Sequence, residues 1–210
     1  YGTAYSGEEI DRMLQEGEQN LPGEDDNGHG TKVVSIAAGS LLEDLNFIGA
    51  APETSIAFVK LKPANASIRR QQQIPLDAVA YEEADMMRAV RYLDMLASEL
   101  EMPLVICLAL GSNSGGHTGA TPLGLYLNEF ARRAGRAIAV AAGNEGNRGH
   151  HFFGVIPGTT GYLDVELRVG EGEKGFQMNL WGNTPGLFSG EVPSPAGERI
   201  PRIFARPLER

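Results

Sequence analysis

The sequence has no cysteine pair for a disulfide, no membrane-spanning segment and no targeting signal. Cys107 is the single cysteine among 210 residues, so it cannot form an intramolecular disulfide, and the redox compartment stays open. No apolar stretch approaches the roughly 20 residues of a membrane-spanning helix. The segment YGTAYSGEEI has no initiating Met, basic region or apolar signal core, so it shows no targeting signal. Its start at Tyr1 predicts a processed or excised piece.

Positive charge is also scarce. The chain has 18 Lys and Arg against 27 Asp and Glu, a formal net charge of -9, and no run of basic residues. Nucleic acids and anionic membranes bind clustered cations, so neither is expected as a partner. Hydrophobic residues make up 42% and charged residues 21% of the chain, which is typical of a globular protein and predicts a sizeable buried core.

Helical and strand patterns alternate over the first 150 residues. Ser6 followed by Glu9 forms a capping box, which predicts a helix over 7–16 that ends at Gly17. The patterns predict further helices over 29–39, 76–100 and 123–134, strands over 55–61, 104–110 and 136–142, and a polar, irregular excursion over 65–75. Such alternation indicates an α/β fold, a parallel sheet with helices on both faces.

The pattern changes after about residue 153. Residues 162–169 and 176–181 alternate apolar and polar side chains, and Pro and Gly become frequent. These features predict the start of an antiparallel β module. The expected division is therefore an α/β domain over 1–157 and a β module over 158–210.

Chemistry is expected where the buried strands end. The glycine-containing loops 111–119 and 143–146 follow two strands directly, and ligands of open parallel sheets bind at the carboxyl ends of strands. His29 begins a predicted helix, whose dipole favours a neutral imidazole able to accept a proton. The amide of Asn144 is suited to stabilise negative charge on an oxygen. Alternatively, the histidine is a capping or surface residue and the asparagine a left-handed turn residue.

Three motifs in order resemble those of subtilisin-like serine proteases. DNGHGTKVVSIAAG at 26–39 is similar to the family's histidine motif, GAAP at 49–52 to its Gly-Val-Ala-Pro stretch, and AVAAGNEG at 139–146 to its oxyanion-hole segment. The strand at 104–111 corresponds to the one that lines the substrate cleft. The resemblance covers about residues 24–150, and it implies a subtilisin-like α/β fold and a serine endopeptidase, a hydrolase of peptidase family S8.

The resemblance also implies residue roles. His29 would be the general base toward a serine hydroxyl, and Asn144 would donate to the tetrahedral oxyanion. The implied substrate-binding residues are Ala109, Leu110, Gly111, Ala142 and Gly143. The first three would pair as an added strand with an extended peptide or protein substrate, and the last two would form a wall of the pocket for the residue before the scissile bond.

Further segments resemble the clostridial spore-germination (Csp) type of subtilase. They are the leading helix, the excursion at 61–77, the loop CLALGSNSGGHTG and the change to β structure after GNRGHHFFG. In that type a jelly-roll-like β module is inserted between the oxyanion segment and the nucleophile, so residues from about 162 onward resemble its opening strands. This implies a bacterial protein that is spore-associated or secreted, although the residues themselves indicate no compartment.

Two of the three triad motifs are missing. The family order is Asp, His, Ser, yet no Asp-Thr-Gly or Asp-Ser-Gly precedes His29 and no Gly-Thr-Ser follows it, with GTT at 158–160 the nearest match. Asp25 and Asp26 lie too close to the histidine to orient it and are predicted to cap the turn. Asn113 occupies the nucleophile position of GSNSG. We therefore expect the central portion of a longer protease, inactive by itself. The alternative is a catalytically dead relative that serves as a binding or regulatory module.

Other ligand chemistries have little support in the sequence. His117, His150 and His151 are candidate metal ligands, but no Cys or acidic residue lies at ligand spacing with them. No Walker or dinucleotide fingerprint is present. We expect no cofactor and no metal at the site, with structural calcium left open. A chain without the Asp strand and the Ser helix would expose apolar sheet surface, which predicts either self-association or cover by the β module.

Overall fold

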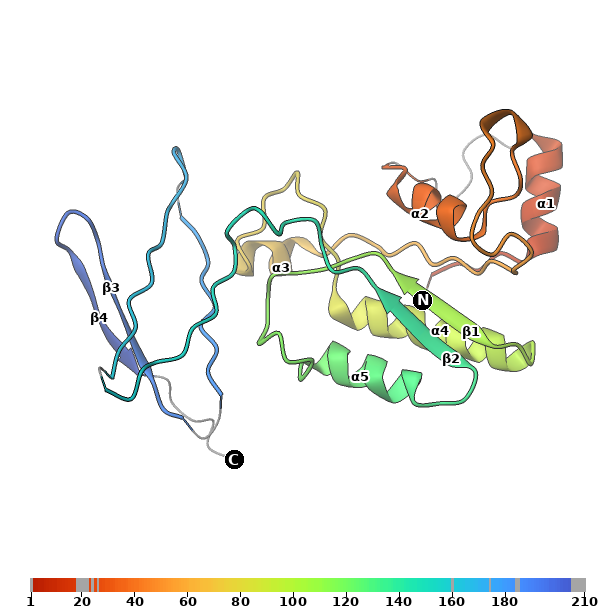
Figure 1. Cartoon of the computed structure of the whole chain (residues 1–210). Helices are drawn as coiled ribbons and strands as arrows, with labels where there is room; N and C mark the ends of the chain where they lie inside the picture. The colour runs from red at the N-terminus through yellow and green to blue at the C-terminus, as the bar shows by residue number, and fades with distance from the viewer. Residues whose placement is uncertain are drawn as a thin grey trace.

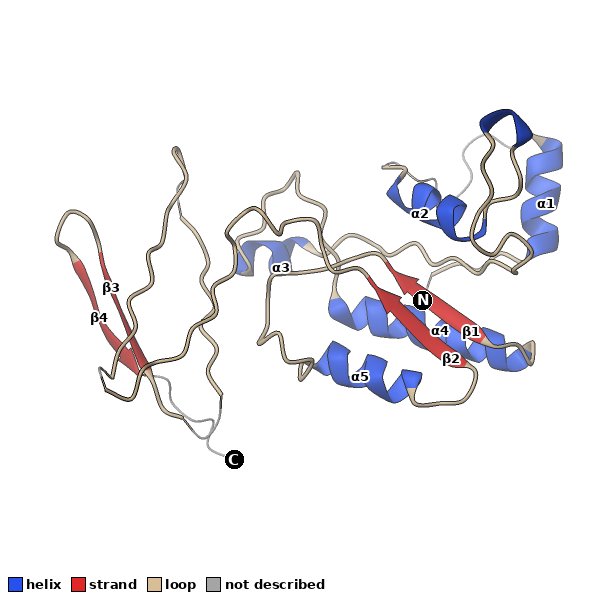
Figure 2. Cartoon of the chain, viewed as in Figure 1, coloured by secondary structure: helices blue, strands red, loops and turns tan. Residues whose placement is uncertain are grey.

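The computed structural model describes residues 2–17, 23, 25, 27–159, 161–173, 175–183 and 186–204. The elements in order are α1 (Gly7–Glu16), α2 (His29–Ala38), the 3-10 helix η1 (Glu43–Leu45), α3 (Ala66–Gln71), α4 (Glu83–Glu99), β1 (Leu104–Leu108), α5 (Pro122–Ala131), β2 (Arg136–Val140), β3 (Ser189–Pro193) and β4 (Arg199–Phe204). Figures 1 and 2 show these elements along the chain. Asp26, Thr160 and residues 205–210, on which parts of the expectations fall, lie outside the described residues.

The first helix forms where its capping box predicts it. The Ser6 hydroxyl accepts a hydrogen bond from the backbone N–H of Glu9 at 3.3 Å. The Glu9 carboxylate in turn accepts from the backbone N–H of Ser6 at 2.7 Å, and this bond lowers the pKa of Glu9. Gly17, with φ of 65°, takes the left-handed conformation that ends α1.

A two-stranded parallel sheet lies at the centre of the α/β part. β1 pairs with β2 in a register that runs from Leu104 opposite Arg136 to Leu108 opposite Val140. Helices α4 and α5 pack against these strands and against each other, and both lie on the same side of the sheet (Figure 1). Helices on both faces of the sheet were expected. In the described part of the chain the face opposite α4 and α5 has no helix packed on it, and Val105 on that face is 72% exposed.

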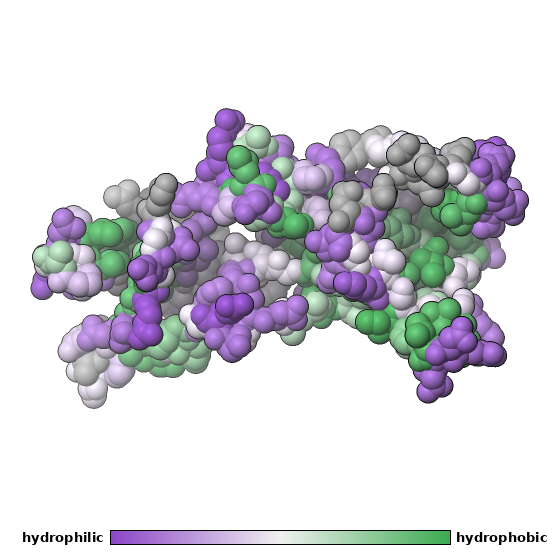
Figure 3. Space-filling view, turned by 90° about the horizontal axis from the view of Figure 1, so that it is seen from above, coloured by the Kyte–Doolittle hydropathy of each residue, from purple (hydrophilic) through white to green (hydrophobic). Residues whose placement is uncertain are grey.

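The core is small. Val90 of α4, Ile106 of β1 and Phe130 of α5 form its buried centre. The partly buried side chains packed around it are Leu93, Leu104, Tyr126, Leu127 and Ile138. Many other large apolar side chains are exposed, and Figure 3 shows such green areas among polar ones. The expectation of a sizeable core is therefore wrong for the described residues, because much of their apolar surface has no packing partner there.

An ion-pair cluster joins α4 to the start of β2. Partial burial of the Asp94 carboxylate raises its pKa, but hydrogen bonds from Arg136 and Arg133 outweigh this and lower it overall. The bonds measure 2.8 Å from Arg136 Nε and 2.6 Å from Arg133 Nη2. Arg136 also donates to the Ser98 hydroxyl at 2.9 Å and to the carbonyl of Met102 at 3.1 Å. The guanidinium therefore fixes the end of α4 to the strand that carries the second site loop.

The excursion before α4 is more ordered than its polar sequence predicts. Asn65 caps the short helix α3 by accepting from the backbone N–H groups of Ser67 and Ile68, both at 3.0 Å. The guanidinium of Arg69 donates to the carbonyls of Ala64, Pro75, Leu76 and Ala78. α4 begins at Glu83 and not near residue 76, because residues 76–82 belong to this loop.

Three predicted strands are absent. Residues 55–61, 162–169 and 176–181 run without a ladder partner in the described chain, and an extended segment becomes a strand only when its backbone is paired. The antiparallel sheet instead consists of β3 and β4, which pair with an irregularity between Gly190 and Val192. This short sheet follows the parallel one, so the α/β fold with a later antiparallel part is confirmed. No helix among the described residues is long and apolar enough to cross a membrane.

Truncating Phe130 tests the small core. Phe130 is 4% exposed, and Phe130→Ala should lower the free energy of unfolding by about 3–5 kcal/mol, because a buried ring is replaced by a cavity. Leu125→Ala on the same helix is the matched control. Leu125 is 59% exposed, and its truncation should cost less than about 1 kcal/mol in urea unfolding. Equal losses for the two variants would contradict the assigned core.

Candidate active site

The turn that carries His29 is built around Asp25. Its carboxylate accepts from the backbone N–H groups of Asn27 at 3.2 Å, Gly28 at 2.7 Å and Thr31 at 3.0 Å. It also accepts from the Thr31 hydroxyl at 2.8 Å. These hydrogen bonds, with that of the Thr31 hydroxyl the strongest cause, hold the pKa of Asp25 far below its usual 3.8. Asp25 therefore caps the turn, as predicted, and sets the direction of the first turn of α2.

His29 lies at the carboxyl end of β1. Its Nε2 is 3.1 Å from the carbonyl oxygen of Ala109, a residue 80 positions away and directly beyond the strand. A carbonyl only accepts, so a hydrogen bond here requires a hydrogen on Nε2. The imidazole is exposed to solvent. Two residues of the predicted site are thus brought together.

The remaining predicted residues lie at the same edge of the sheet. The backbone N–H of Ala141 donates to the carbonyl of Leu108 at 3.1 Å, which continues the parallel pairing beyond the end of β2. Residues 142–144 therefore leave the sheet beside 109–111. Gly143, with φ of 91°, makes the turn that precedes Asn144. The side chain of Asn144 is exposed, and among the described residues it makes no hydrogen bond with His29 or with the backbone of 109–111.

The GAAP stretch packs against the end of α2. The backbone N–H groups of Ala50 and Ala51 donate to the carbonyls of Ile36 and Ala37 at 3.0 and 2.8 Å. A Cβ atom at Gly49 would collide with the backbone nitrogen of Gly39, so only glycine fits there. This motif thus holds the helix that presents His29, and its role is structural.

Sequence reasoning missed a polar cluster between the two site loops. Asn113 Nδ2 donates to Glu145 Oε2 at 2.8 Å, and His150 Nδ1 is 3.0 Å from the same oxygen. The hydrogen bonds from Asn113 first, and then from His150, lower the pKa of Glu145. The signal available in the sequence was the position of both loops directly after neighbouring parallel strands, which places their polar side chains at one edge.

The histidines of this region do not form a metal centre in the described ranges. The rings of His117 and His151 stack with centroids 5.0 Å apart and an interplanar angle of 14°. No group of three or more His, Cys, Asp or Glu side chains converges there as metal ligands. His150 does contact one acidic residue, Glu145, although the spacing along the sequence had indicated no acidic partner for it.

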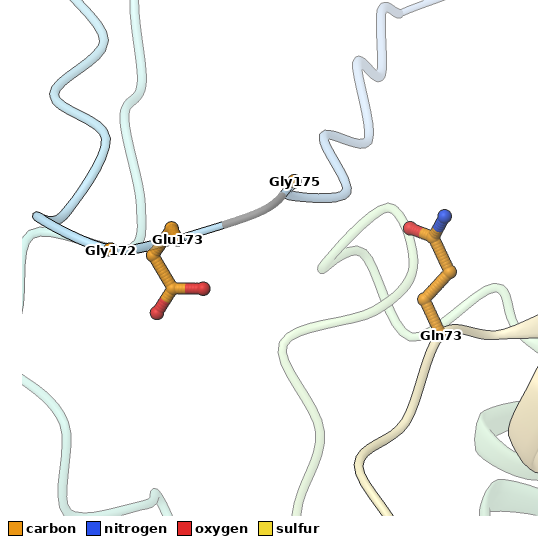
Figure 4. Close-up of a pocket in the computed structure, with 4 residues that line it drawn as sticks. All are labelled: Gln73, Gly172, Glu173 and Gly175. Carbon is orange, nitrogen blue, oxygen red and sulfur yellow. The ribbon is translucent and has the colours of Figure 1, made fainter.

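A separate surface hollow lies away from these residues. It measures about 450 Å³ and is lined by Gln73, Gly172, Glu173 and Gly175. The two side chains that line it do not converge, as Figure 4 shows. None of the predicted site residues lines this hollow, so it does not support a substrate-binding role for them.

Comparison with known proteins connects this arrangement to one family. The profile described as the subtilase family, peptidase S8, matches residues 6–164. A similar solved structure is that of the Clostridium perfringens CspB protease, with a TM-score of 0.50 and 33% sequence identity over 59% of this chain and 24% of that chain. The chain thus spans about a quarter of that protein's length. No curated protein matches.

The cap at Asp25 predicts a pH-dependent contribution to stability. Because the pKa of Asp25 is depressed in the folded chain, its carboxylate stabilises the fold at pH above the usual 3.8, and the contribution is lost as the pH falls below that value. The free energy of unfolding of the wild type should therefore exceed that of Asp25→Asn near pH 6 and converge with it in acid. Urea unfolding across the pH range measures this.

Thr31→Val is the matched variant for the same cap, because it keeps the side-chain shape and removes only the hydroxyl donor. It should reduce the pH-dependent difference without abolishing it. A difference between wild type and Asp25→Asn that grows as the pH falls would contradict the assigned role.

Proposed function

Because this chain belongs to the subtilase family, we propose that it is part of a serine endopeptidase in which His29 is the general base and Asn144 the oxyanion donor. The observation that carries the proposal is the position of His29, with Nε2 3.1 Å from the carbonyl of Ala109 at the end of β1. A base in this place lies beside the backbone that an extended peptide would occupy. The missing Asp and Ser would come from polypeptide outside these 210 residues.

The tautomer of His29 supports a need for such an aspartate. With hydrogen on Nε2, as the contact to Ala109 requires, that nitrogen cannot accept a proton from a serine hydroxyl. A carboxylate that accepts from Nδ1–H would hold the opposite tautomer and free Nε2. The 210 residues taken alone therefore lack both the nucleophile and the group that prepares the base.

The reaction would then proceed through an acyl-enzyme. His29 Nε2 takes the serine proton as the serine oxygen attacks the scissile carbonyl, and the Asn144 amide donates to the resulting oxyanion. His29 returns the proton to the leaving amine, and water hydrolyses the ester in a second cycle of the same steps. Backbone hydrogen bonds between the substrate peptide and residues 109–111 would hold the substrate extended. Ala142 and Gly143 would form a wall of the pocket beside it.

We extend the proposal to the Csp type of subtilase, a bacterial, spore-associated or secreted protein whose β module begins near residue 158. Support comes from the 33% identity to the CspB protease and from the short antiparallel sheet that follows the α/β part. The substrate class would be an extended peptide or protein, with no cofactor. The alternative is a pseudoprotease that binds partners without cleaving them, which would also lack intact flanking triad motifs.

Peptidase assays separate these functions. The 210-residue chain should not cleave casein or a chromogenic peptide, because it lacks a nucleophile. The complete gene product should cleave both, and His29→Ala should abolish turnover. Asn144→Ala should reduce kcat by about 10²–10³-fold, the magnitude known for loss of the oxyanion donor in subtilisin. Asn128→Ala, an exposed asparagine of α5, is the matched control. An inactive complete protein would favour the pseudoprotease.

The open face of the parallel sheet predicts self-association of the 210-residue chain. Val105 on that face is 72% exposed, and apolar sheet surface of this kind favours contact with a second copy. Light scattering should show a mass that rises with concentration, and Val105→Thr, which keeps the side-chain shape, should weaken the association. Val79→Thr, at a 68% exposed position outside the sheet, is the control. A monomer at high concentration would contradict this prediction.

A further inference from the structure

The two loops of the candidate site are joined by side chains with no assigned role. Asn113 lies on the loop after β1, and Glu145 and His150 lie on the loop after β2. Asn113 Nδ2 donates to Glu145 Oε2 at 2.8 Å across 32 residues of chain, and His150 Nδ1 lies 3.0 Å from the same oxygen. We call these three residues the loop bridge.

The chemistry of the loop bridge fixes its donors and acceptor. His150 Nδ1 is also 3.4 Å from Asn113 Nδ2, but an amide N–H cannot donate to a ring nitrogen that itself carries hydrogen. A His150 that is protonated at Nδ1 and an Asn113 amide can both donate to one carboxylate oxygen. Glu145 is then the shared acceptor, and hydrogen bonds to a charged acceptor are stronger than neutral ones.

Two further contacts reinforce the same arrangement. His117 of the first loop stacks on His151 of the second, with ring centroids 5.0 Å apart. The first loop also contacts Trp181: a Cβ atom at Gly116 would lie 3.1 Å from Cε3 of that residue, so the indole rests directly against the glycine backbone. The loop after β1 is therefore held from both the second loop and the following β part.

Glu145 directly follows Asn144 in the chain, so whatever fixes the Glu145 side chain also restricts the turn that carries the Asn144 amide. That turn starts at Gly143, whose φ of 91° makes the backbone permissive. The side chains of Glu145 and His150 are 53% and 52% exposed. Because solvent weakens interactions between exposed charged groups, this restraint is modest in strength.

We infer that Asn113 and Glu145 are positioning residues, whose hydrogen bond sets the spacing of the loops after β1 and β2 and the placement of the Asn144 amide, with His150 as a second donor. This inference rests on the proposed function for its catalytic consequence, whereas the restraint itself concerns only the chain described here. An oxyanion donor acts fully only when its position is fixed before the charge develops.

The restraint is tested without any activity by backbone amide hydrogen exchange in the 210-residue chain. Glu145→Ala should speed exchange over 111–119 and 142–150 by about two- to fivefold, because the shared acceptor is lost. Glu145→Gln keeps an acceptor oxygen for the Asn113 amide and should recover most of the difference. Asn113→Ala leaves the hydrogen bond from His150 to Glu145, so it should speed exchange by no more than Glu145→Ala does. The double variant should not exceed Glu145→Ala, because the acceptor of the Asn113 amide is already lost there.

Glu53→Ala and Glu53→Gln, at an exposed turn of the chain, are the matched controls and should not change exchange in these loops. Exchange in Glu145→Ala equal to that of the wild type would overturn the inference. Exchange in Glu145→Gln as fast as in Glu145→Ala would also overturn it, since the negative charge and not the hydrogen bond would then slow exchange. Additive effects of the two substitutions in the double variant would overturn it as well.

Kinetics of the complete protein test the catalytic consequence. Glu145→Ala and Asn113→Ala should each lower kcat about three- to tenfold with KM changed less than about twofold, a smaller effect than loss of the oxyanion donor itself. Glu145→Gln should restore most of kcat. A rise in KM with unchanged kcat would overturn the positioning role. A complete protein with no activity would instead refute the proposed function, and the exchange result would still decide the restraint.

Discussion

Five residues of β1 lie in parallel register with five of β2, and the contact of Ile106 with Val90 and Phe130 holds this pair against α4 and α5. The position of the candidate site depends on that pairing. Parallel strands end at the same edge, so the loops that begin at Ala109 and Ala141 must start side by side, whatever their own sequences. The ion pairs of Arg136 with Asp94 fix the start of β2 and so keep the register that aligns the two ends.

The helices and the sheet were largely predictable from local sequence. The Ser6 and Glu9 capping box and the small-residue helix after His29 determine structure through contacts close in the chain. The apolar run after Pro103 is a strand because β2 lies beside it as a ladder partner. The segment at 55–61 has an equally clear strand pattern and yet forms no strand, because a ladder needs a partner that local sequence does not supply. The same holds for residues 162–169 and 176–181.

The candidate site was predictable in part. The motifs indicated His29 and the ends of both strands, and Asp25 was rightly expected to cap the turn. They gave no indication of the contact between His29 and Ala109, which depends on how α2 is placed by the GAAP stretch and Gly49. Nor did they reveal the loop bridge, since Asn113 and Glu145 meet only because β1 and β2 are neighbours. Long-range contacts of this kind follow from topology, and the spacing of residues along the chain does not encode them.

The indole against Gly116 has a practical meaning. Trp181 is the only tryptophan of the chain, so all of its indole fluorescence originates beside the loop that follows β1. The ring is 62% exposed, which leaves its emission sensitive both to water and to any group that enters or leaves its surroundings. The molecule thus contains a native optical reporter of the loop that follows β1, readable without a label.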